Sequence, residues 1–241
     1  LGYPAIGTET RLLVASRGDT LDARAVMRFD TLVQNFTRGG KDSTIYTLDS
    51  AAVNILLDTT GTKATEPVTI ELYDVDTTAV DTAVSTALSL FRPDRLIGSK
   101  TYAATDLKDS LHVPLENDKV LLKLRGEAPR RLRIGFKVSS TASAQIRIIS
   151  VEGGGAPTLS YDPSPDSAVH SIVNSVTSLT PTDNPTLKND LRDYQIVANS
   201  LSTSAGNLLG VGGLPAQRTY LRFDIPQRLI DSATVVRATL L

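Results

Sequence analysis

The sequence predicts a mainly-β protein built of antiparallel β-sandwich units in tandem, with a few short helices. Short runs in which apolar and polar residues alternate recur along the chain, and this pattern is typical of half-buried strands. A motif is repeated near the two ends, at Arg24–Asp30 and Arg218–Asp224, which indicates repeated units. With 41% hydrophobic and 21% charged residues among 241, the chain can bury a sizeable core.

Six alternating runs predict the strands of the first unit. In Ala51–Leu57, the side chains of Val53, Ile55 and Leu57 share one face, because successive residues of a strand point to opposite sides. One dry and one wet face per strand favours an antiparallel sandwich over a parallel sheet, whose strands are buried on both faces. The runs are Arg11–Ser16, Arg24–Asp30, Ala51–Leu57, Pro67–Tyr73, Arg131–Val138 and Ala144–Val151.

Three segments show helical spacing instead. Thr78–Leu90 repeats alanine every four residues, with Asp76 as a candidate N-cap and Pro93 beyond its end. Asn117–Leu124 lies between a polar start and Gly126. Asp166–Leu179 has the same spacing, although it is rich in Ser, Val and Thr, which are weaker helix formers.

A change in composition after residue 152 predicts the domain boundary. Three consecutive glycines follow Glu152, and proline and serine then recur as far as Pro185, which is the composition of linkers and irregular connections. We therefore expect a first sandwich over residues 1–152, a linker or irregular connection over 153–190, and the first strands of a second, incomplete sandwich over 191–241.

The repeated motif has a structural interpretation. In the Arg-Phe-Asp sequence that ends each copy, the phenylalanine faces the core, while the arginine and aspartate on either side of it share the opposite face and lie close enough to pair. The functional alternative is an Arg–Asp ligand site. The motif residues are Arg28, Phe29, Asp30, Arg222, Phe223 and Asp224.

Several short segments around the second motif resemble a known family. They are Asp193-Tyr-Gln-Ile, Ala205-Gly-Asn, Leu209-x-Val-Gly, Arg218-Thr-Tyr-Leu-Arg-Phe-Asp-Ile-Pro226 and a Ser-Ala-Thr-Val run. Together they resemble DNRLRE-type modules, closely over Asp193–Leu241 and more loosely over Ile6–Tyr73. The first copy departs from the pattern, because Thr and Leu follow Asp30 where Ile and Pro follow Asp224. The resemblance implies jelly-roll-like β-sandwiches of extracellular or cell-surface proteins, related to some carbohydrate-binding modules.

Composition narrows the chemistry that the chain can perform. Cysteine is absent and only two histidines occur, which excludes thiolate nucleophiles, cysteine zinc sites and iron–sulfur clusters. A net charge of −1 gives no signature of nucleic-acid binding. No apolar run approaches the ~18 residues of a membrane helix, so we expect no membrane span in this segment. No pair of carboxylates stands out for hydrolysis, and we expect a protein that is not an enzyme and has no cofactor.

Two binding sites remain as hypotheses. Asp74, Asp76 and Asp81 could supply oxygen ligands to Ca²⁺, although an Asp-x-Asp sequence after a strand is more often a turn followed by a helix cap. Tryptophan, the ring best suited to a sugar platform, is absent. The aromatic residues left as candidates for a glycan site are Tyr73, Tyr102, Tyr161 and Tyr194.

These observations predict a non-enzymatic extracellular structural or scaffolding protein, part of a cell-surface or filamentous assembly, whose partners are other copies of itself or neighbouring modules. The alternative is a carbohydrate-binding or adhesion module of a larger secreted protein, with polysaccharide as partner. Each expected sandwich lacks strands that the other has. We therefore expect that the chain continues into a longer one or that neighbouring copies supply the missing strands by β-augmentation.

Overall fold

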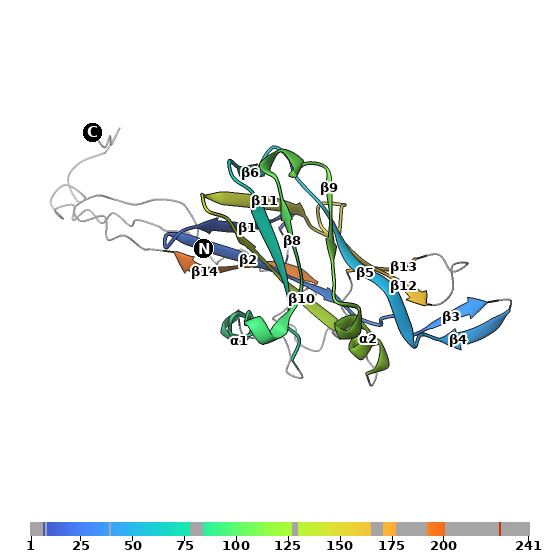
Figure 1. Ribbon diagram of the computed structural model, residues 1–241. Helices are drawn as coiled ribbons and strands as arrows, with labels where there is room; N and C mark the ends of the chain where they lie inside the picture. The colour runs from blue at the N-terminus through green and yellow to red at the C-terminus, as the bar shows by residue number, and fades with distance from the viewer. Residues whose placement is uncertain are drawn as a thin grey trace. The chain divides into compact units, whose positions relative to one another are not determined.

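The computed structural model describes residues 7, 9–38, 40–77, 84–126, 130–164, 171–176, 192–200 and 227. The chain divides into two compact units, Leu1–Leu201 and Ser202–Leu241, and nearly all described residues belong to the first (Figure 1). Strands account for 54% and helices for 13% of the described residues, which confirms the mainly-β prediction.

Two antiparallel sheets and a hairpin form the first unit. The large sheet has the order β6-β11-β1-β2-β10-β7-β8, with β14 paired to β2, and the smaller sheet has the order β13-β12-β5-β9. The strands of the large sheet are β1 (Arg11–Arg17), β2 (Leu21–Phe29), β6 (Lys63–Ala64), β7 (Val68–Asp74), β8 (Leu96–Tyr102), β10 (Leu132–Ser139), β11 (Ala144–Ile149) and β14 (Asp193–Ser200). The smaller sheet comprises β5 (Thr47–Leu56), β9 (Ser110–Pro114), β12 (Thr158–Ser164) and β13 (Ile172–Ser175), and the hairpin comprises β3 (Asn35–Arg38) and β4 (Lys41–Thr44).

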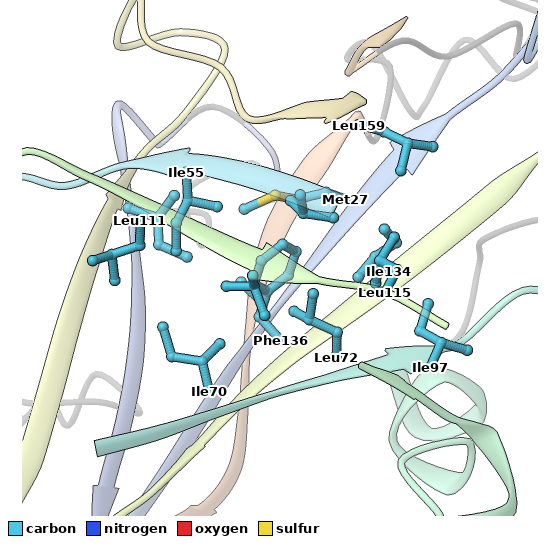
Figure 2. Packing of buried hydrophobic residues seen from close by; sticks show 14 of the residues in the cluster. Met27, Ile55, Ile70, Leu72, Ile97, Leu111, Leu115, Ile134, Phe136 and Leu159 are labelled. Atoms are coloured by element: carbon cyan, nitrogen blue, oxygen red, sulfur yellow. The ribbon is translucent and has the colours of Figure 1, made fainter. Parts of the chain in front are cut away.

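The main core lies between the two sheets. Met27 of β2 and Phe136 of β10 are 0% exposed and belong to the same buried cluster as Ile55 of β5 and Leu111 of β9. Figure 2 shows these side chains gathered together. The alternation read from the sequence therefore places one face of each sheet inward, as a sandwich requires.

The two sheets also approach each other at their margins. At one margin the Tyr102 hydroxyl donates to the His112 carbonyl at 2.6 Å, and a Cβ added to Gly98 would lie 2.2 Å from the Pro114 carbonyl oxygen. At the other, the Asp58 N–H donates to the Arg147 carbonyl at 2.8 Å. Glycine at position 98 is therefore required by the close approach of β8 to β9.

Strands on both sides of residue 152 share the same sheets. β12 and β13 lie within the expected linker, yet β12 pairs with β5 and β13 pairs with β12. β14, at the start of the expected second sandwich, pairs with β2. Apart from Arg192, β14 and Gln227, residues 191–241 are not described, so the second sandwich stays a prediction.

The three helix predictions have different outcomes. α2 (Asn117–Arg125) confirms the helix expected at Asn117–Leu124, and α1 (Val84–Ser89) covers the later part of Thr78–Leu90, whose first six residues are not described. The helix expected at Asp166–Leu179 is wrong where the structure describes it, because β13 is a strand. Pairing with β12 satisfies the backbone there, and β-branched Ile172 and Val173 suit a strand.

Phe29→Ala should lower the free energy of unfolding by about 3–5 kcal/mol, because it removes a fully buried ring and leaves a cavity. Urea denaturation followed by circular dichroism measures this change. Leu122→Ala, at a side chain that is 68% exposed, is the matched control and should change stability by less than about 0.5 kcal/mol. Equal effects of the two substitutions would contradict the assignment of Phe29 to the core.

Candidate strand-docking site

Strand β14 lies along β2, the strand that carries the first copy of the motif (Figure 1). Their register pairs Asp193 with Met27 and Val197 with Ala23, and the Arg28 N–H donates to the Arg192 carbonyl at 2.8 Å. β2 also pairs with β1 over residues 21–23 and with β10 over residues 25–29. Apart from Arg24, the residues of β2 that pair with β14 thus also have a partner in β1 or β10, and β14 completes the pairing of a buried strand.

Two side chains of β14 enter an apolar cluster distinct from the main core. Tyr194 and Ile196 are buried there, and they alternate along the strand on one face. We call this set the outer cluster; its buried members are Val26, Tyr73, Val75, Ala87, Leu90, Tyr194 and Ile196. Phe91 packs against it, with its ring centroid 5.4 Å from that of Tyr73. Strand β14 therefore covers apolar surface as well as backbone.

Polar contacts fix the beginning of β14. The Val151 N–H donates to the Asp193 carboxylate at 2.9 Å, and the Leu13 N–H donates to the Gln195 side chain at 3.0 Å. Arg192 forms an ion pair with Glu152 at 3.3 Å. Since the contacts of Asp193 and Gln195 reach backbone groups of fixed position, they select one register for the strand.

The buried position of Asp193 changes its acidity. Burial raises the pKa of the Asp193 carboxyl to about 6, and the neighbouring Glu152 carboxylate acts in the same direction, while the hydrogen bond from Val151 opposes both. The protonated acid is favoured because a charge in this dry position is costly. The start of β14 is therefore a titrating contact.

The first copy of the motif lies beside this docking site. Phe29 is fully buried in the main core, and Arg28 and Asp30 form a buried ion pair at 3.0 Å. Burial lowers the pKa of Arg28, and the Asp30 carboxylate opposes that effect. On the neighbouring strand β10, buried Arg133 donates to the Val75 carbonyl at 3.4 Å and to the Tyr194 hydroxyl at 3.5 Å. The second copy, Arg222, Phe223 and Asp224, lies outside the described residues.

The carboxylates considered as calcium ligands contact cationic side chains. The Lys123 ammonium lies 2.9 Å from Asp74 and 3.5 Å from Asp76, and Arg131 lies 2.7 Å from Asp76. The Asp76 N–H donates to the Asp74 carboxylate at 3.0 Å, as in the turn that we gave as the alternative. Asp81 lies outside the described residues, and the described part of the chain holds no group of three histidine, aspartate or glutamate side chains able to bind a metal. Calcium binding at Asp74, Asp76 and Asp81 stays a prediction.

The four tyrosines considered for a glycan platform are buried. Tyr73, Tyr102, Tyr161 and Tyr194 are each less than 9% exposed, so none presents a ring face to a polysaccharide. Sequence reasoning missed Tyr46, which is 66% exposed and has the Arg125 guanidinium 5.8 Å from its ring centroid. Tyr46 lies in the connection between β4 and β5, outside any strand, so no periodicity in the sequence indicates its exposure.

An open hollow of about 360 Å³ lies at the margin of the large sheet. Its lining is Thr62, Lys63, Ala64, Thr65, Ala104, Leu107 and Ser143. This lining offers hydroxyl groups and one ammonium but no aromatic ring. It therefore adds no stacking surface to the glycan-binding alternative.

A scan against family models finds no match for this chain, and no curated protein matches it. The resemblance to DNRLRE-type modules therefore stays a prediction. None of the helices in the described ranges is both long and apolar enough to cross a membrane.

Asp30→Ala should cost about 3–5 kcal/mol of stability, since it removes the carboxylate that pairs with the buried Arg28 guanidinium. Chemical denaturation of the full chain checks this value. Asp94→Ala breaks an exposed Arg–Asp pair of the same spacing and should leave the denaturation midpoint unchanged. A similarly small effect for Asp30→Ala would mean that the motif pair is not structural.

Asp193→Asn should flatten the pH dependence of β14 docking between about pH 4 and pH 6. Because the folded pKa of Asp193 is raised, its contribution is fully present below its ordinary value and is lost as the pH rises through about 6. Hydrogen exchange of the β14 amides across this pH range measures the effect. The exposed Asp49→Asn should keep the parent's dependence. A variant Asp193→Asn that titrates like the parent would contradict the assignment.

Proposed function

We propose that this chain is a non-enzymatic structural module of an extracellular assembly, held to other copies of itself or to neighbouring modules by strand pairing. The observation that supports the proposal is the position of β14. A strand that follows the proline- and serine-rich stretch supplies an edge strand to a sheet built from residues before 152. Addition of a strand to an existing sheet is a common way for protein segments to join.

Polar and charged side chains of the described residues bind one another within the fold, which agrees with a structural role. Asp58 receives hydrogen bonds from Thr60 and lies 3.4 Å from both Arg11 and Arg147. His112 shares a hydrogen bond of 2.8 Å with Asn54 on the neighbouring strand. These groups stabilise turns and strand pairs.

Tyr46 is the feature that favours the alternative, a carbohydrate-binding or adhesion module. Its exposed ring lies near Arg125, and Leu122, three residues earlier on α2, is also exposed. Exposed aromatic rings bind the apolar faces of sugars. A single ring is a small platform, so strand-mediated assembly remains our first proposal.

Sedimentation velocity of the full chain over a range of concentrations tests the proposed function, and electron microscopy shows the form of any product. We expect assemblies that grow with concentration, together with no retention on a polysaccharide panel. A chain that stays monomeric at every concentration, and that binds a polysaccharide through Tyr46 as judged by Tyr46→Ala, would replace the proposal with the alternative. Immunogold labelling of intact source cells tests the surface location.

A further inference from the structure

We propose that the edge of β2 that pairs with β14 is an acceptor site for residues 192–200 of a second copy of this chain, so that each copy donates β14 to the next and copies join head to tail. The proposal deepens the function proposed above and rests on it. Its starting point is that acceptor and inserted strand come from separate parts of the sequence. Every acceptor group described above precedes residue 153, and every group on the inserted strand follows residue 191.

Recognition depends on the sequence of β14 as well as on its backbone. Asp193 receives the Val151 N–H at one end, and Tyr194 and Ile196 enter the outer cluster at alternate positions. Gln195, between them, receives the Leu13 N–H. A slip by one residue would send the two apolar side chains to the wrong face. The acceptor site along β2 thus favours a strand with an acidic, an aromatic, a polar and an aliphatic residue in that order.

The same contacts form whether β14 comes from the same chain or from another. Exchange of an identical element needs no new interface, and it is a low-cost route to assembly. Among the described strands, β14 pairs with β2 alone, and it ends at the boundary between the two compact units. Concentration therefore decides the outcome, because exchange between chains gains over the intramolecular contact as copies are crowded together. Each copy offers one acceptor and one strand, so donation of β14 from each copy to the next builds a filament, whereas reciprocal exchange between two copies closes a dimer.

Single-cysteine variants test the exchange, because the chain contains no cysteine. Ala23 of β2 and Val197 of β14 are register partners, and side chains of paired residues lie close enough for a disulfide. Ala23→Cys and Val197→Cys chains are unfolded, mixed, refolded together and oxidised. We expect a disulfide-linked dimer of the two different chains, with a yield that rises with concentration.

A matched control uses Val173→Cys in place of Val197→Cys. Val173 is 58% exposed on β13, which does not pair with β2, so this mixture should give at least several-fold less dimer. Tyr194→Ala and Ile196→Ala, placed in the Val197→Cys chain, should lower the yield, whereas Tyr46→Ala should not.

If a cysteine variant fails to fold, a competition experiment replaces the test, in which an excess of synthetic peptide 192–200 is added to the parent chain. The peptide should dissolve the assemblies because it competes with β14 for β2, and a peptide with Tyr194→Ala should not.

Two outcomes would overturn the proposal. A double variant that carries both Ala23→Cys and Val197→Cys can form the same disulfide within one chain. If the disulfide forms only in this double variant, and never between the two single-cysteine chains at any concentration, β14 stays within its own chain. Assemblies that grow in sedimentation experiments without this cross-link, and that resist the peptide, would show that copies join through another surface. The second result would leave the proposed function standing, whereas a chain that does not assemble at all would remove both.

Discussion

The backbone pairing of β2 is the constraint on which the rest of the first unit depends. This strand lies inside the large sheet, where each N–H and C=O group requires a partner because water cannot reach it. β1 pairs with the first part of the strand, β10 pairs with the later part, and β14 lies along both parts. Because β1 and β10 continue to separate neighbours, β11 and β7, the pairing of β2 also determines how the large sheet is ordered.

The same strand carries side chains of two environments. Met27 and Phe29 point into the main core, whereas Val26 belongs to the outer cluster and Arg28 to a buried ion pair. A strand buried on both faces needs such partners on each, and the outer face obtains them from α1, Phe91 and β14. Charged residues are buried beside this cluster: the Arg28 N–H donates to the Arg192 carbonyl, and Arg133 donates to the Tyr194 hydroxyl. Buried charges are tolerated where other charges and hydrogen bonds compensate them.

Part of the candidate site could be predicted from the sequence. The alternation of Asp193-Tyr-Gln-Ile predicts a strand, and the structure has one there. The partner of that strand could not be predicted, because the proline- and serine-rich composition after Glu152 suggested a boundary. The burial of the four candidate tyrosines could not be predicted either, because alternation along a strand does not say which of its faces another element covers. The exposure of Tyr46 could not be predicted either, because this residue lies between β4 and β5, where no strand periodicity applies.

The sequence by itself determined the class of fold, six strands of the first unit (β1, β2, β5, β7, β10 and β11) and the inward faces of β5 and β10, because these follow from local periodicity and composition. It did not indicate β3, β4, β6, β8 or β9. Tertiary structure alone decided that β12, β13 and β14 join earlier strands, that Asp74 and Asp76 pair with Lys123 and Arg131, and that residues 172–175 form a strand. The physical reason is that strand pairing and ion pairing join residues far apart in the chain. Their free energy depends on which neighbour is present, and local periodicity does not contain that information.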